Sequence, residues 1–132
     1  MAKGHRTQIK KERNSENRDK RPQAHGKYLS IAETKARIML NEVKGKRVNE
    51  AIAILEYSPR YASRLIEKIL KSAIANAENN LGLDTEKLYV QEAIAGRAPS
   101  INSRWRLSPR AKGRGYRIER QVSHISIYLG ER

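Results

Sequence analysis

Cysteine and phenylalanine are absent from this chain, and tryptophan occurs once, at Trp105. Without cysteine the chain has neither a disulfide framework nor a cysteine-based zinc site, which suits a reducing cytosol. None of its apolar runs approaches the ~18–20 residues that a membrane span requires. Its basic N-terminus lacks the apolar stretch of a secretory signal. We therefore expect a cytoplasmic protein that does not enter a membrane.

The side chains that enzymes use occur without the spacing that catalysis needs. The histidines (His5, His25 and His124) are scattered, and none has a second ligand at helical spacing. Serine and the acidic residues form no recognisable catalytic motif. We expect no catalytic residue, no metal site and no cofactor. A lone histidine in a strand, such as His124, is typical of a structural or RNA-facing group.

Positive charge exceeds negative charge by 14 at neutral pH, and the excess is unevenly distributed. Residues 1–27 hold nine basic and three acidic side chains, and residues 96–120 hold eight and one. Residues 28–95, with ten and nine, are close to neutral. A basic surface can serve solubility alone, but solubility does not need this concentration in two segments. The layout favours a protein that neutralises a polyanion.

The segment from Gly96 to Arg120 combines the second cationic cluster with residues that interrupt helices. These are Pro99, Pro109, Gly113 and Gly115. The charges oppose burial in a dry core, and the flanking β-branched and aliphatic residues predict strands. We therefore interpret residues 96–117 as a long, protruding hairpin. Arginine pairs with phosphate and stacks on bases, and Trp105 adds a stacking surface, so RNA is the partner that fits best.

The near-neutral remainder predicts a single α+β domain, residues 28–132, behind a basic arm, residues 1–27. The arm contains almost nothing that can be buried, so we expect it to be disordered until a partner neutralises it; a flexible solubility tail is the alternative. The domain should hold three helices on a small antiparallel sheet. The expected elements are an edge strand at 28–31, helices at 32–43, 50–57 and 60–79, and strands at 86–95 and 116–129.

Polar residues before each helix predict its N-cap. Ser30 and Glu33 form a possible capping box for the first helix. Asn49 is suited to cap the second, and Ser58 the third, with Pro59 at its first helical position.

The end of the first helix carries Gly45 among the cations Lys44, Lys46 and Arg47. Glycine is suited to the left-handed conformation there. The cations serve either the helix dipole or a phosphate contact, and both readings stay open. Further on, Val122 interrupts the alternation of the last strand, which predicts a bulge or twist nearby.

Five collinear motifs carry a resemblance to a known family. They are Lys35-Ala36-Arg37 leading to Lys44-Gly45-Lys46, then Leu70–Asn80, Leu88-Tyr89-Val90, Pro109–Gly115 and Ser123-His124-Ile125. With them the chain from Tyr28 to Glu131 resembles the large-subunit ribosomal protein family numbered twenty-two, of bacterial type.

The resemblance implies a small α+β body whose hairpin penetrates ribosomal RNA and reaches the wall of the nascent-peptide exit tunnel. It implies a structural constituent of the large subunit that supports assembly and is not an enzyme. Expected partners are large-subunit ribosomal RNA, neighbouring ribosomal proteins and the nascent peptide, without self-association. The segment Ile101–Ser108 is longer than the commonest bacterial tip, and we expect the hairpin tip to lie there.

Charge and resemblance together select the residues expected to bind RNA. They lie in the arm (Lys3, Arg6, Lys10, Lys11, Arg13, Arg18, Lys20, Arg21 and Lys27), in the body (Lys35, Arg37, Lys46, Arg60, Arg64 and His124) and in the hairpin (Arg97, Arg104, Trp105, Arg106, Arg110, Lys112, Arg114, Arg117 and Arg120). Two competing functions remain: a binding module for DNA or a different RNA, and an RNA-acting enzyme, for which a catalytic set is missing.

Overall fold

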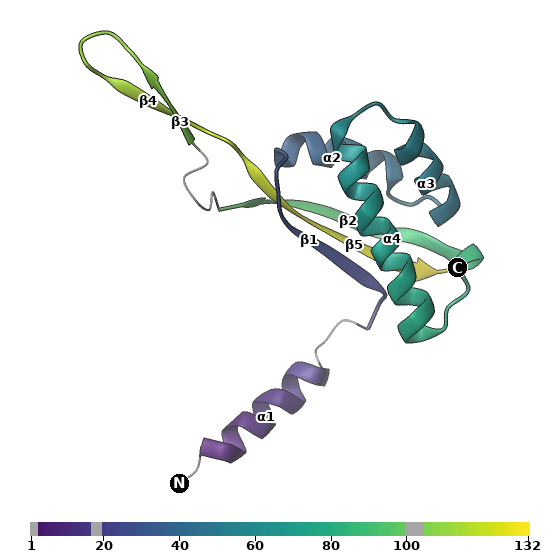
Figure 1. The fold of residues 1–132 in the computed structure, drawn as a ribbon. Coiled ribbons are helices and arrows are strands. Elements are labelled where there is room, and N and C mark those ends of the chain that lie inside the picture. Colours follow the sequence, from purple (N-terminus) through teal and green to yellow (C-terminus); the bar gives the residue numbers. More distant parts are fainter. Residues whose placement is uncertain (1–2, 17–19, 100–104) are drawn as a thin grey trace.

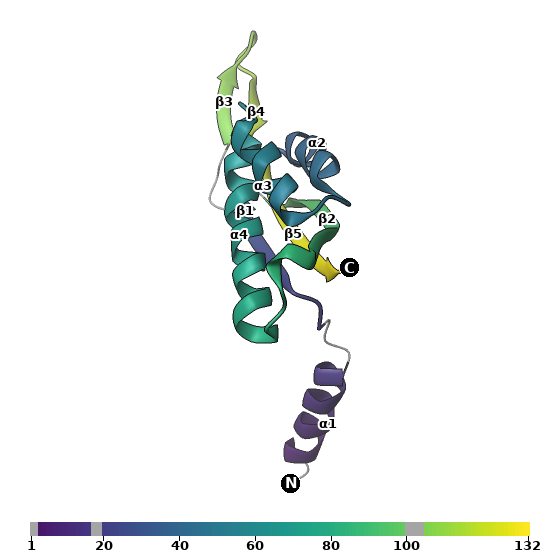
Figure 2. The same ribbon diagram turned by 90° about the vertical axis from the view of Figure 1, so that its right-hand side faces the viewer.

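A computed structural model describes residues 3–16, 20–99 and 105–132. The elements, in chain order, are α1 (Lys3–Glu16), β1 (Gln23–Leu29), α2 (Glu33–Val43), α3 (Val48–Tyr57), α4 (Tyr61–Leu81), a short 3-10 turn η1 (Thr85–Lys87), β2 (Leu88–Ala98), β3 (Trp105–Pro109), β4 (Gly115–Glu119) and β5 (Val122–Glu131). Helices α2, α3 and α4 pack on one side of a small antiparallel sheet, from which a hairpin projects (Figures 1 and 2). The α+β prediction is therefore confirmed.

The main sheet has the order β1-β5-β2, so the last strand of the chain lies in the middle. Side chains along β5 alternate between its two faces: Ile125, Ile127 and Leu129 are fully buried beneath the helices, and His124 and Tyr128 are half-buried on the open face. This period of two agrees with the strand predicted at residues 116–129 only in its second half. The structure divides that range into β4 and β5, which belong to different sheets and are separated by residues 120 and 121.

Helix α4 closes the core because its inner face carries small residues where it meets β1. Ala73 and Ala77 are fully buried there. A methyl group added to Gly26 of β1 would collide with Cδ1 of Ile69, so a larger residue here would require the Ile69 side chain to shift. The side-chain amide of Asn76 donates to the carbonyl of Gln23 (3.0 Å), which ties the helix to the edge strand.

Strand β1 begins at Gln23, five residues before the predicted edge strand, and it ends at Leu29. It begins early because Gln23 and Ala24 pair with Tyr128 and Ile127 of β5, a contact between distant parts of the chain. Its register shifts between Gly26 and Leu29, opposite His124. The irregularity predicted near Val122 is therefore present in this region.

The predicted helix caps are wrong at all three N-termini. The N-cap residues are Ala32, Arg47 and Arg60, and none of them makes a side-chain capping bond. Buried residues stand at the start of α3 (Val48) and second in α4 (Ala62), whereas the first buried residue of α2 is Ala36. The left-handed conformation predicted for Gly45 is confirmed (φ 81°).

Helix α1 lies in the arm, for which the sequence predicted no regular structure. It stands away from the body (Figure 1), and its described side chains, Thr7 to Glu16, are all exposed. A helix of this length with no packed face gains little stability from tertiary contacts. This isolation agrees with the expectation that the arm depends on a partner for its order. No helix in the described residues is both long and apolar enough to cross a membrane.

The buried position of Leu70 predicts that truncating its side chain destabilises the fold. Replacing the fully buried Leu70 by alanine should lower the free energy of unfolding by about 2–5 kcal/mol, because it removes apolar contacts and leaves a cavity. The matched change Leu81→Ala, at a side chain that is nearly half exposed, should cost within about 0.5 kcal/mol. Urea unfolding of the full chain measures both. Equal losses for the two variants would contradict the core described above.

Candidate nucleic-acid interface

The hairpin is a second sheet of two strands, β3 and β4, that shares no ladder with the main sheet. Its register pairs Trp105 with Glu119 and Pro109 with Gly115. The chain reverses between them, where the amide of Arg110 donates to the carbonyl of Arg114 (2.8 Å). Lys112 and Gly113 adopt left-handed conformations in this turn (φ 59° and 69°). The tip is therefore a tight turn rather than a broad loop.

This geometry corrects the predicted position of the tip. The turn lies at residues 110–114, not within Ile101–Ser108, because Trp105–Pro109 is itself a strand of the hairpin. Residues 101–104, including Arg104, lie outside the described part of the chain, as does Arg18. Trp105 begins β3, away from the turn.

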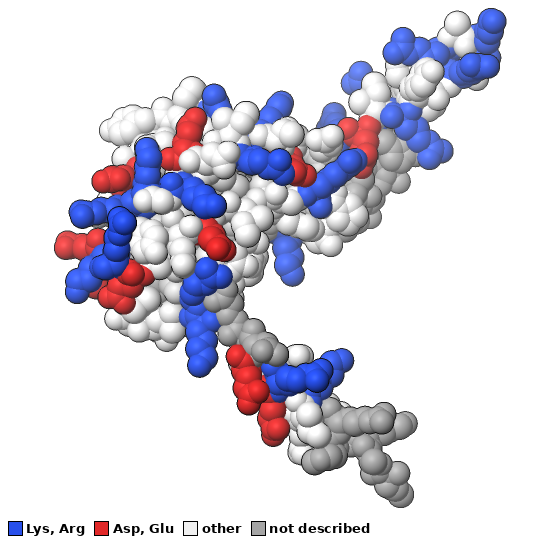
Figure 3. Space-filling model, turned by 180° about the vertical axis from the view of Figure 1, so that it is seen from behind, with Lys and Arg blue, Asp and Glu red and all other residues white. Residues whose placement is uncertain are grey.

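The hairpin exposes nearly all of its side chains. From Arg106 to Gln121 every residue is exposed except Ser108, which is half-buried. Basic side chains crowd its outer end, whereas acidic and basic groups are interspersed over the body (Figure 3). A two-stranded hairpin without a core is only marginally stable in water. Its cations are therefore displayed on a surface that the protein does not pack against.

The negative charge available to these cations within the segment is small. Glu119 is the one acid between Gly96 and Arg120, and it pairs with Arg97 (3.0 Å) at the root of the hairpin. Near the tip, the guanidinium of Arg110 lies 5.5 Å from the ring centroid of Tyr116. Such a contact orients the arginine but does not neutralise its charge. An external anion is the natural counter-charge for this surface.

Apolar residues on the hairpin were missed by the sequence reasoning. Leu107, Tyr116 and Ile118 are each more than half exposed. In the hairpin register Arg106 lies opposite Ile118, and Leu107 opposite Arg117, so cations and apolar groups adjoin across the strands. The sequence signal for them was the alternation of apolar and cationic residues along Tyr116, Arg117 and Ile118, which a count of charges alone does not reveal.

The predicted arm residues are divided between the helix and the sheet. Lys10, Lys11 and Arg13 are exposed on α1, which also contains Lys3 and Arg6. Lys20 precedes β1 and Lys27 belongs to it, and both are exposed. Arg21 lies over the ring of Tyr128 (4.9 Å), hydrogen-bonds Gln91 (3.3 Å) and approaches Glu92 (3.7 Å). Arg21 therefore also has a structural role on the open face of the sheet.

Of the predicted body residues, Lys35 and Arg60 line one hollow with Arg120 at the root of the hairpin, and the others lie outside its lining. Lys35, Lys46, Arg60 and Arg64 are exposed, and Arg37 is paired with Glu33 one helical turn away. Residues around Lys46 also serve the fold, since Gly45 donates to the carbonyl of Val90 (2.8 Å) and Val90 donates to that of Lys46 (2.9 Å). The backbone of this loop is thus structural, and its side chains remain available.

His124 has a structural partner. Its Nδ1 accepts the backbone N–H of Tyr28 (3.1 Å), and the two rings meet edge-on with centroids 4.6 Å apart. This bond fixes the tautomer, leaving a proton on Nε2. It also holds the register shift of β1, where Tyr28 has a φ of 55°. Its predicted RNA contact stays a prediction.

The pKa of one basic group in the body departs from its ordinary value. The hydrogen bond from Lys71 to Glu67 (2.6 Å), aided by the charge of that carboxylate, raises the pKa of Lys71. Lys71 is therefore already engaged by an acid, unlike the cations at the hairpin tip. Among residues 3–16, 20–99 and 105–132, no group of His, Asp or Glu is placed to hold a metal ion.

An α+β body that holds out a coreless cationic hairpin defines a class of small basic proteins. Residues 24–130 match the protein family described as "Ribosomal protein L22p/L17e". The chain belongs to this family. It is accordingly a structural constituent of the ribosome and not an enzyme.

Curated relatives extend the match over the arm. The chain is 56% identical, over the full length of both, to the large ribosomal subunit protein uL22 of Lachnoclostridium phytofermentans. It is 52% identical, again over both full lengths, to the protein of the same name from Lachnospira eligens. The protein of that name from Clostridium kluyveri is 48% identical over 83% of this chain and 96% of its own length.

The left-handed conformation of Gly113 predicts that a substitution there destabilises the hairpin turn and leaves the body unchanged. Replacing it by alanine should cost about 1–2 kcal/mol locally, because an L-residue with a side chain is strained at positive φ. The amide of Arg110 should then exchange its hydrogen faster, with the body unchanged, as measured by NMR. Gly96→Ala is the matched control, since an added methyl group meets no atom within 4 Å at either site. Equal exchange rates in the two variants would contradict this account of the tip.

Proposed function

We propose that this protein binds large-subunit ribosomal RNA through its hairpin and its basic arm. The observation that carries the proposal is the hairpin tip, where Arg110, Lys112 and Arg114 are exposed on a turn without a core. Each guanidinium or ammonium group near a phosphate releases condensed counterions, which supplies a favourable free energy at low salt. RNA contacts would also order a hairpin that is marginal by itself.

The family membership supports a more specific place for this interaction. The relatives are named large ribosomal subunit proteins, so the compartment proposed for the chain is the large subunit of the cytoplasmic ribosome. There the α+β body would rest on the RNA surface, with neighbouring ribosomal proteins, while the hairpin enters the folded RNA. Rigid packing of the strands into RNA from several regions would support assembly of the subunit.

The hairpin turn is the part proposed to line the nascent-peptide exit tunnel. It is the end of the projecting hairpin farthest from the body (Figure 1), so it would penetrate deepest into the subunit. With the tip at residues 110–114, a nascent peptide would meet the Lys112–Gly113 turn. The protein acts as one copy, since its charged extensions repel a second copy of themselves.

If the hairpin binds RNA, removal of its cations should change the salt dependence of RNA binding. Replacing Arg110, Lys112 and Arg114 together by alanine should lower the slope of log K against log salt by roughly 0.7–0.9 for each lost phosphate contact. The measurement is binding of the full chain to large-subunit ribosomal RNA over a salt series.

A charge-matched control separates local contact from net charge. Lys68, Lys71 and Lys87 lie on the body, and Lys71 and Lys87 have acidic partners (Glu67 at 2.6 Å and Asp84 at 3.8 Å). The variant with alanine at all three positions loses as much positive charge as the hairpin variant. It should nevertheless keep most of the slope of log K against log salt. Identical slopes for the two variants would oppose a hairpin interface. Comparable affinity for unrelated DNA duplexes would instead favour a general nucleic-acid-binding module.

A further inference from the structure

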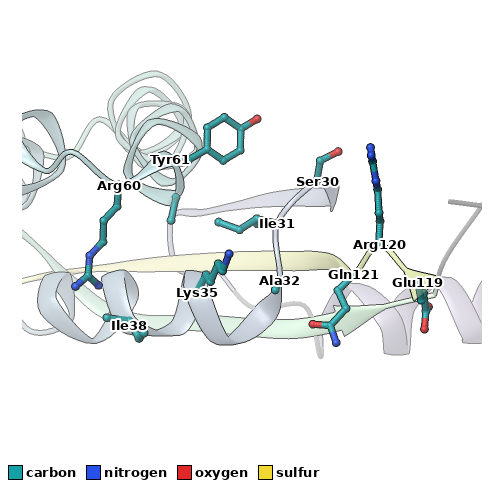
Figure 4. A pocket seen from close by; sticks show the side chains of 11 residues that line it. Ser30, Ile31, Ala32, Lys35, Ile38, Arg60, Tyr61, Glu119, Arg120 and Gln121 are labelled. Carbon is teal, nitrogen blue, oxygen red and sulfur yellow. The ribbon is translucent and has the colours of Figure 1, made fainter. Parts of the chain in front are cut away.

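A cavity of about 760 Å³ lies at the root of the hairpin. It is bounded by the start of α2, the start of α4 and the junction between β4 and β5 (Figure 4). These segments are distant in the sequence and meet only in the fold. The volume lies within the roughly 300–1,000 Å³ that small-ligand sites occupy. None of the contacts described above fills this space.

The lining of the cavity is largely apolar. Ile31 and Ala62 are buried parts of the wall, whereas Ile38 and Tyr61 are 50% and 61% exposed. An aliphatic and an aromatic side chain exposed in one hollow offer contact to a flat apolar group. The phenol ring of Tyr61 is directed over the space beside Ile31 in Figure 4.

Cations surround this apolar lining. Lys35, Arg60 and Arg120 line the cavity, and they take part in none of the ion pairs formed within the described residues. The one acid in the lining, Glu119, is engaged by Arg97 (3.0 Å) and points away from the Arg120 guanidinium in Figure 4. The N-cap residues of α2 and α4 also lie here, so both helix dipoles add positive potential. The cavity is apolar inside and positively charged at its rim.

We propose that this cavity binds one unpaired nucleotide of ribosomal RNA. The base would lie against Tyr61 and Ile38, and the phosphates on either side of it would contact Lys35, Arg60 and Arg120. A paired base in an A-form helix cannot present its face in this way, whereas an extruded base can. This site rests on the proposed function, and it would anchor the hairpin at its root while the tip is held by RNA further in.

The charge pattern favours a nucleotide over a protein segment. A peptide tail would have to combine an apolar group with several carboxylates to match three cations. A single nucleotide already combines a flat base with phosphates on both sides. A nucleotide therefore matches the cavity better than a protein segment does.

Photo-cross-linking in assembled large subunits identifies the occupant. The full chain is expressed in bacterial cells with p-benzoylphenylalanine in place of Tyr61, and the large subunits are isolated and irradiated. The expected result is a cross-link to a single unpaired RNA nucleotide. A cross-link to protein, a cross-link to a base-paired nucleotide, or none at all would overturn the nucleotide site. The same replacement of Tyr57, an exposed residue of α3 outside the cavity lining, is the matched control and should not reach that nucleotide.

A second position separates this proposal from the proposed function. With the photoreactive residue in place of Tyr116 on the hairpin, the proposed function expects a cross-link to ribosomal RNA. An RNA cross-link from position 116 without one from position 61 removes the cavity site alone. Absence of the chain from the large subunit, or no RNA cross-link from position 116, counts against the proposed function itself.

Truncation of Tyr61 then measures the strength of the contact between its ring and the RNA base. In subunits that carry Tyr61→Ala, the nucleotide found by cross-linking should become more reactive to base-specific chemical modification. Loss of one base–aromatic stack corresponds to a roughly 5- to 150-fold change in the equilibrium between bound and released base. Tyr57→Ala should leave that reactivity unchanged. Equal reactivity in Tyr61→Ala and wild-type subunits would contradict stacking on Tyr61.

Discussion

Repulsion among the cations of the hairpin is the constraint around which this structure is arranged. Arg110, Lys112 and Arg114 lie within five residues of one another, and the only acid of the segment is engaged at its root. A compact fold could not bury these groups, because unpaired charges lose their hydration there. The protein instead holds them outside the body on two strands without a core. In this arrangement the hairpin gains no stability from a core of its own.

The body supplies what the hairpin lacks, a rigid support. Strand β5 lies between β1 and β2 in the middle of the sheet, and it continues from β4 across only two residues. The hairpin is therefore anchored to the most buried strand of the protein. The pair Arg97–Glu119 joins both sides of the root, although at exposed side chains it contributes at most about 1 kcal/mol. The direction of the hairpin is therefore set by β5, and the ion pair adds only a small contribution.

Much of the fold follows from periodicity that can be read in the chain. The helix predicted at residues 60–79 is present as α4, and β5 carries the alternation of the predicted last strand, because both patterns follow from local geometry. The helix caps were predicted wrongly because capping rules read single polar residues, whereas α3, for example, begins with the buried Val48, one residue before Asn49. The early start of β1 was missed because its partner strand lies a hundred residues further on, where Gln23 meets Tyr128.

For the interface, the sequence by itself determined the kind of chemistry: an excess of cations in two segments, with no set of residues for catalysis. Charge and residue type are properties of the chain and need no fold to be known. Only the tertiary structure decided the geometry. It placed the tip at residues 110–114, gave His124 a backbone partner in Tyr28, and brought Lys35, Arg60 and Arg120 to one cavity. These outcomes depend on strand pairing and helix packing between distant residues, which no local pattern records.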